Sequence, residues 1–170
     1  MGLRFSYIVV IDNAFKTKLE DILCEFPSHS YNEGECLSIT FGLDRELFSY
    51  LKEVIMHQNF RWWKWMFFRK ADHPEYFPSR DAGSIGCIYY RTINHPDKQE
   101  MFCVFTAATN SMSRLFVCSD SVKKYFADLA SSLEAKCCFI DLEDEGFIVV
   151  HGEEATAHQL KNMFDNFSDY

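Results

Sequence analysis

A chain of 170 residues, of which 48% are hydrophobic and 16% aromatic, can bury a core and is too apolar to be disordered. Its formal net charge of −8 argues against binding to nucleic acid or to an anionic membrane surface, because both are negatively charged. The apolar runs are short and interrupted by charges, so the sequence predicts no membrane span.

The first third of the chain alternates strands with helices. Residues 4–12 form a hydrophobic, β-branched run that predicts a strand. Apolar residues then recur at helical spacing as far as Pro27, which ends the predicted helix. Residues 29–35 are polar and predict a loop, whereas residues 36–42 predict a second strand. Asp44 is the expected cap of a second helix.

The middle of the chain predicts an antiparallel meander. Residues 84–93 and 100–109 alternate well enough for two strands, and residues 94–98 between them have the composition of a turn. Residues 60–69 are strongly aromatic and are interpreted as a central or half-buried strand. Residues 72–83, with two prolines, predict a connecting loop.

The last third predicts a strand, a helix, a hairpin and a final helix. Residues 114–118 are the expected short strand, and Ser119 is the expected cap of the helix that follows. Residues 137–142 and 147–151 flank residues 143–146, which predict a tight hairpin turn. The final helix then carries its apolar residues on one face.

These elements predict an α+β fold, with a mixed, largely antiparallel sheet packed by about four helices. No linker, low-complexity tract or repeat divides the chain, so we expect a single domain over residues 1–170. Seven cysteines, an odd number in mostly apolar contexts without an export signal, predict reduced thiols in a cytoplasmic protein.

Nearly all of the net charge lies in residues 141–170, where eight carboxylates face one lysine and give the segment a charge of −7. The candidate partner-binding acids are Asp141, Glu143, Asp144, Glu145, Glu153 and Glu154. A concentrated acidic face attracts basic partners. The alternative is structural, because acids stabilise helix N-termini and keep hairpin turns soluble.

The three tryptophans, Trp62, Trp63 and Trp65, are the second candidate. Basic residues interleave with them, a pattern that can bind single-stranded nucleic acid, but the charge of the whole chain argues against that function. A half-buried strand explains the aromatic residues more simply. Any exposed ring would be a candidate contact for a protein partner.

No motif predicts catalysis, a metal or a cofactor. His151 and His158 lie on either side of Glu153 and Glu154 without a recognised metal-binding spacing. The chain has neither a nucleophile-elbow motif nor a glycine-rich phosphate loop. We therefore expect no catalytic residue, no metal site and no cofactor.

In composition and size the chain is similar to bacterial immunity proteins and antitoxins, which block nuclease or other toxins. That similarity implies a non-enzymatic inhibitor that neutralises a basic, nuclease-like toxin through its acidic surface. The alternative is a small-molecule-binding domain or an enzyme of unfamiliar type, with a pocket lined by aromatic residues of the central strands. A third possibility is a subunit of a larger assembly.

Overall fold

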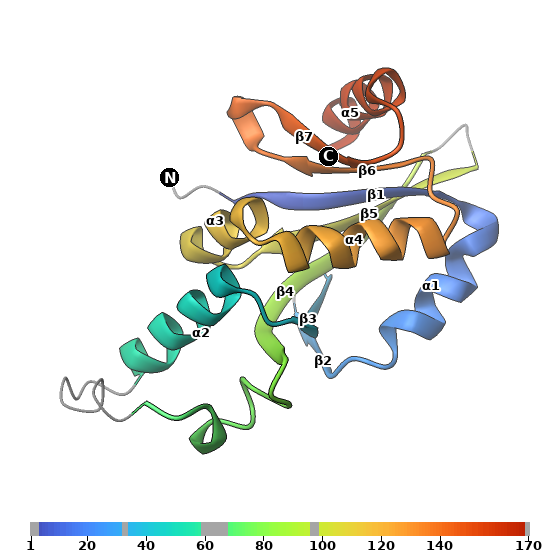
Figure 1. The fold of residues 1–170 in the computed structure, drawn as a ribbon. Coiled ribbons are helices and arrows are strands. Elements are labelled where there is room, and N and C mark those ends of the chain that lie inside the picture. Colours follow the sequence, from blue (N-terminus) through green and yellow to red (C-terminus); the bar gives the residue numbers. More distant parts are fainter. Residues whose placement is uncertain (1–3, 32–33, 59–67, 96–98, 169–170) are drawn as a thin grey trace.

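The computed structural model describes residues 4–31, 34–58, 68–95 and 99–168, and these contain one seven-stranded sheet (Figure 1). The strands are β1 (Ser6–Asp12), β2 (Ser28–Tyr31), β3 (Gly34–Gly42), β4 (Ala82–Asn94), β5 (Glu100–Ala107), β6 (Cys137–Asp141) and β7 (Phe147–His151). Their order in the sheet is β2-β3-β4-β5-β1-β6-β7. The helices are α1 (Lys16–Leu23), α2 (Arg45–Gln58), α3 (Asn110–Cys118), α4 (Asp120–Ser132) and α5 (Glu154–Ser168). Three single 3₁₀ turns are η1 (Asn13–Phe15), η3 (Lys70–Asp72) and η4 (Glu143–Glu145).

The predicted α+β fold is confirmed. The strand pairings among the described residues are all antiparallel, whereas the sequence predicted a mixed sheet with a largely antiparallel character. The same residues contain five α-helices where about four were expected.

Strand β1 lies inside the sheet and explains the continuous hydrophobic run at the start of the chain. Successive side chains of a strand point to opposite faces. Tyr7, Val9 and Ile11 therefore enter one buried cluster, whereas Ile8 and Val10 enter the other. Both faces of this strand are covered, so it needs apolar residues at every position rather than at alternate ones.

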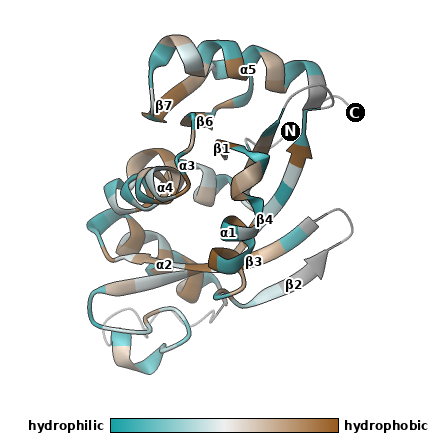
Figure 2. Cartoon of the chain, turned by 90° about the vertical axis from the view of Figure 1, so that its right-hand side faces the viewer, coloured by the Kyte–Doolittle hydropathy of each residue, from teal (hydrophilic) through white to brown (hydrophobic). Residues whose placement is uncertain are grey.

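The helices are divided unequally between the two faces of the sheet. Helices α1 to α4 supply apolar residues to the larger cluster on one face, and α5 alone supplies Ala157, Leu160 and Phe164 to the smaller cluster on the other. Figure 1 shows α5 on one side of β6 and β1, with α3 and α4 on the opposite side. In Figure 2, α5 lies beside β6 and β7 at one end of the molecule, away from α2.

Two elements differ from the prediction. Residues 114–118, predicted as a strand, belong to α3, because Thr109 caps this helix by accepting from the N–H of Met112 (3.2 Å), and Leu115 and Phe116 share its buried face. Residues 28–31, which include part of a predicted loop, form β2 at the edge of the sheet. An edge strand does not require alternating apolar residues. The polar sequence of residues 28–31 therefore did not predict a strand.

The expectation that all seven thiols are reduced is wrong for one pair. Cys36 of β3 and Cys87 of β4 form a disulfide, with their Cα atoms 5.3 Å apart. Cys36 pairs with Tyr89, two residues from Cys87, so the two cysteines are diagonal neighbours on the same face of adjacent strands. That proximity comes from strand pairing across 51 residues of chain. The free cysteines are Cys24, Cys103, Cys118, Cys137 and Cys138.

Candidate partner-binding surface

The predicted acidic segment folds into a hairpin followed by a helix. Strands β6 and β7 are antiparallel neighbours, joined through η4, and α5 follows β7 directly. The N–H of Leu142 donates to the carbonyl of Gly146 (2.9 Å), which closes the turn. Gly146 has a φ of 101°, a backbone conformation that glycine adopts without a steric penalty. The predicted hairpin over these residues is thus present, with η4 as its turn.

The structure divides the exposed acids into two groups, one at each end of β7. Glu143, Asp144 and Glu145 form η4, which precedes β7. Glu153 and Glu154 follow β7 at the start of α5. A strand of five residues extends about 16 Å, so the two groups do not form a single cluster. They flank the strand instead.

Asp141 belongs to neither group, because it is largely buried against α5. Its Oδ1 lies 3.3 Å from Nζ of Lys161, which also contacts the carboxylate of Asp165, and the side chains of Asp141 and Lys161 are only 16% and 12% exposed. Burial raises the pKa of Asp141, and Lys161 offsets only part of that effect. The pKa of Lys161 is also raised: burial lowers it, but Asp165 and Asp141 outweigh that effect. The lysine of this segment is therefore already occupied by two carboxylates.

Five other acids of the segment lie in solvent. Glu143, Asp144, Glu145, Glu153 and Glu154 are all exposed. Within the described part of the chain none of them forms an ion pair, although Oε1 of Glu143 accepts the backbone N–H of Arg4 (3.1 Å). The electrostatic fields of exposed carboxylates that form no ion pair add together, and the summed field attracts basic molecules from a distance.

The strand between the two acidic groups is itself apolar. Phe147 and Val149 pack against the smaller cluster under α5, and Val150 packs against the larger one. Ile148 lies between Phe147 and Val149 in the strand and is 36% exposed. Among the described residues, it is the large hydrophobic side chain that is exposed to solvent. The sequence does not mark this strand as a site, because only the strand order places it at the sheet edge.

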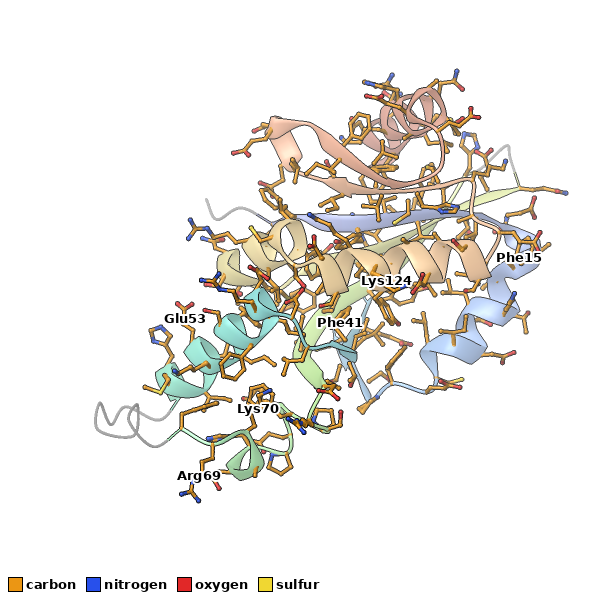
Figure 3. All side chains as sticks on the ribbon, in the orientation of Figure 1. Phe15, Phe41, Glu53, Arg69, Lys70 and Lys124 are labelled. Carbon is orange, nitrogen blue, oxygen red and sulfur yellow. A yellow bond between two sulfur atoms is a disulfide. The ribbon has the colours of Figure 1, made fainter. Side chains whose placement is uncertain are left out.

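The tryptophan candidates Trp62, Trp63 and Trp65 lie outside the described residues. The end of that segment is described from Phe68, whose ring packs against Phe48 of α2 and against Phe77 with centroids 6.0 and 6.1 Å apart. Nζ of Lys70 lies 5.1 Å from the centroid of the Phe48 ring. Figure 3 shows Arg69 and Lys70 at the end of the molecule opposite α5.

The two histidines near the acidic groups make local contacts. The ring of His158 meets the ring of Phe147 edge-on, with centroids 4.7 Å apart, and Nδ1 of His151 lies 3.4 Å from Oγ of Ser131. Across residues 4–31, 34–58, 68–95 and 99–168, no group of three or more His, Cys, Asp or Glu residues could hold a metal ion.

The central aromatic residues pack against one another in the core. The ring of Tyr7 stacks on Phe126 with centroids 3.9 Å apart, and Phe105 meets the same ring at 5.2 Å. The hydroxyl of Tyr7 donates to the carbonyl of Phe116 (2.8 Å), and Tyr7, Phe105 and Phe126 are all completely buried. Burial raises the pKa of Tyr7 far above its usual value, so this hydroxyl stays protonated.

Comparison of the chain with protein-family models, with curated proteins and with solved structures finds no match. None of the helices in the described part of the chain is both long enough and apolar enough to cross a membrane.

Proposed function

We propose that this protein is a non-enzymatic binding protein that neutralises a basic protein partner. A nuclease-like toxin is the partner that fits best, and the protein would then act as bacterial immunity proteins and antitoxins do. The observation that carries the proposal is the pair of exposed acidic groups around β7, while Lys161, the one lysine of residues 141–170, is taken up by Asp141 and Asp165.

Electrostatics explains how such a surface would inhibit. A cleft that binds nucleic acid phosphate is basic, so it also attracts carboxylates, and complementary fields accelerate association. The acids of η4 and of the α5 start are held on ordered elements and project into solvent. They could therefore occupy phosphate positions without first being ordered by the partner.

The opposite end of the molecule carries charges of both signs. Arg69, Lys70 and Glu53 lie there, far from α5 (Figure 3), and α2 and η3 also include Glu46 and Asp72. A basic partner would therefore be attracted mainly to the acidic end. The concentration of negative charge thus favours encounters through the β6–β7 hairpin.

The proposal includes a cytoplasmic location. Five free cysteines, three of them buried, support it. The Cys36–Cys87 disulfide is the observation against it, because disulfides are rare in reducing compartments.

The alternative, a small-molecule-binding domain or an enzyme with an aromatic-lined pocket, has less support. The aromatic residues of the central strands pack against one another and against Phe126, so those rings are occupied in forming the core. No described observation favours this alternative over the binding protein.

The test begins with a pull-down from a lysate of the native organism at low and high salt, followed by surface plasmon resonance with the captured protein. The variant is Asp144→Lys/Glu145→Lys/Glu153→Lys. The matched control is Glu20→Lys/Asp21→Lys/Glu25→Lys, which makes the same charge change at exposed positions on and just after α1. We expect a basic partner whose activity falls as the protein is added.

We also expect the association rate to fall as salt rises, and the acidic-end variant to bind about tenfold or more weakly than the control variant. Unchanged affinity in the acidic-end variant, together with a salt-insensitive association rate, would overturn the proposal. The aromatic segment of residues 60–70 would then be the better interface candidate.

A further inference from the structure

Strand β7 is one of the two outermost strands of the sheet. It pairs with β6 on its inner side, and within the described residues no strand pairs with its outer side (Figure 1). A free strand edge presents backbone N–H and C=O groups that can pair with another chain. The other edge of the sheet is β2, which is polar.

The register identifies the backbone groups of β7 that face outward. In an antiparallel pair, residues alternate between pointing toward their partner and pointing away from it. The N–H of Leu142 donates to the carbonyl of Gly146 (2.9 Å), so Ile148, two residues on, also points toward β6. Phe147 and Val149 therefore direct their N–H and C=O groups to the open edge.

The side chains along this edge are apolar, which is unusual for a free edge. Natural proteins protect exposed edge strands with charges, proline, a bulge or a short strand. Strand β7 is five residues long and has a register shift between Val149 and His151, but it contains no proline, lysine, arginine or acidic residue. Here the strand reads Phe-Ile-Val-Val-His, and Ile148 is 36% exposed. The charges lie beyond its two ends, in η4 and at Glu153 and Glu154.

The charges at the two ends determine what can cover the edge. Antiparallel pairing with β7 of a second copy would place η4 of one chain beside Glu153 and Glu154 of the other. Parallel pairing would place η4 beside η4. Like charges meet in both arrangements, so charge disfavours a second copy. An extended segment with basic residues at both ends has the complementary pattern.

We propose that β7 binds an extended segment of the basic partner as an added strand of the sheet. The segment carries alternating apolar residues, with basic residues before and after them. Backbone hydrogen bonds to Phe147 and Val149 provide the pairing, Ile148 contacts an apolar side chain, and the two acidic groups bind the basic ends. This inference rests on the proposed function and specifies the form in which the partner is recognised.

A synthetic peptide tests the inference without knowledge of the partner. The probe has a Val-Thr-Val-Thr-Val core with two lysines at each end. One control replaces the central valine with proline, which keeps the charge but removes a backbone donor and disrupts the extended pairing. A second control places all four lysines at one end. Binding is measured by fluorescence anisotropy, and backbone pairing by amide hydrogen exchange.

We expect the probe to bind about fivefold or more tightly than either control. Exchange at the amides of Phe147 and Val149 should slow on binding, whereas exchange in β2, the other edge, should not change. Equal affinity for the probe and the proline peptide would overturn strand addition but leave an electrostatic binding protein standing. Undiminished peptide binding by Asp144→Lys/Glu145→Lys/Glu153→Lys would overturn the role of the acids, and with it the proposed function.

Two variants of the protein complete the test. Ile148→Lys introduces a positive charge beside the basic peptide at an exposed position, and Ile148→Thr keeps the β-branched shape with less apolar surface. We expect peptide affinity to fall in both variants, more in the lysine variant, while the thermal unfolding midpoint of the threonine variant stays close to that of the wild type. Unchanged affinity in both, or a dimer in sedimentation that the peptide dissociates, would overturn the proposal.

Discussion

Asp44 joins the starts of two helices through a single carboxylate. Its Oδ1 accepts the N–H of Leu47 (2.8 Å) and thereby caps α2. Its Oδ2 accepts the hydroxyl of Ser119 (2.6 Å) and the N–H of Ser121 (3.0 Å) at the start of α4. Ser119 in turn caps α4 by accepting the N–H of Val122. The sequence predicted both caps separately, but only the fold brings them together.

Replacement of Asp44 should separate its two roles. Asp44→Asn keeps an acceptor for Leu47 but places a donor opposite Ser119 and Ser121, and we expect it to lower the free energy of unfolding by about 1–2 kcal/mol. Asp44→Ala also removes the α2 cap, and this loss should lower the free energy of unfolding by about 1 kcal/mol more. Urea unfolding measures both, with Asp128→Asn at an exposed α4 position as control. Equal losses in the two Asp44 variants would show that the Oδ1 cap of Leu47 contributes nothing beyond the bonds made by Oδ2.

Asp44 should also make stability depend on pH. Burial raises its pKa, but hydrogen bonds from Ser119, Leu47 and Ser121 outweigh burial and hold the pKa below the usual 3.8. A carboxyl group with a lowered pKa stabilises the folded state above its unfolded-state pKa, and the contribution disappears as pH falls through the folded value. The stability difference between wild type and Asp44→Asn should therefore shrink between about pH 6 and about pH 3. A constant difference over that range would contradict this assignment.

At the scale of elements, α5 covers its face of the sheet alone. Its residues Ala157, Leu160 and Phe164 meet Phe102 of β5 and Phe139 of β6 in the smaller cluster. The larger cluster, by contrast, receives residues from four helices. Attachment of α5 therefore depends on few side chains, although α5 carries one of the two acidic groups at its start.

Phe164→Ala tests that attachment. The Phe164 ring is buried and lies 5.8 Å from the Phe102 ring, centroid to centroid. Its removal should lower the free energy of unfolding by about 3–5 kcal/mol and speed amide exchange in α5 first. Gln159→Ala, at an exposed position on the same helix, is the control and should change stability by less than about 0.5 kcal/mol. A loss below about 1 kcal/mol in Phe164→Ala would mean that the smaller cluster contributes little.

The Cys36–Cys87 disulfide ties β3 to β4 and gives a second prediction at this scale. Alkylation of the unfolded, unreduced protein should label the five free cysteines, and alkylation after reduction should label all seven. Reduction should lower the free energy of unfolding by about 2–4 kcal/mol, because it releases a loop closed across 51 residues. The stability of Cys36→Ser/Cys87→Ser should not respond to reductant. Seven labels before reduction would contradict the disulfide and strengthen the proposed cytoplasmic location.

At the scale of the whole molecule, charge is unevenly distributed. Residues 141–170 carry −7 of the net −8, whereas the opposite end carries both signs, with Arg69 and Lys70 near Glu53 (Figure 3). A net negative charge repels phosphate, and an acidic end does so most strongly. This distribution is the basis on which we expect protein partners rather than nucleic acid.

We therefore predict no tight binding to nucleic acid. Anisotropy titrations with single-stranded DNA and RNA should give dissociation constants weaker than about 10⁻⁶ M at physiological salt, because phosphate contacts require a basic surface. An acidic protein of similar size serves as the negative control. Sub-micromolar affinity would contradict the prediction and would assign a phosphate-binding role to the basic residues of segment 61–70.

The sequence by itself determined the fold class and the positions of most strands, because local hydrophobic alternation and helix caps require no distant partner. It also identified the acidic segment, since charge is a property of composition. Strand order was not accessible in this way. Only the tertiary structure paired Cys36 with Cys87 and placed β7 at an edge, because these features depend on contacts between residues that are far apart in the chain. The helix over residues 110–118 was missed for a local reason, since the four consecutive apolar residues 115–118 resembled a short strand until the Thr109 cap was considered.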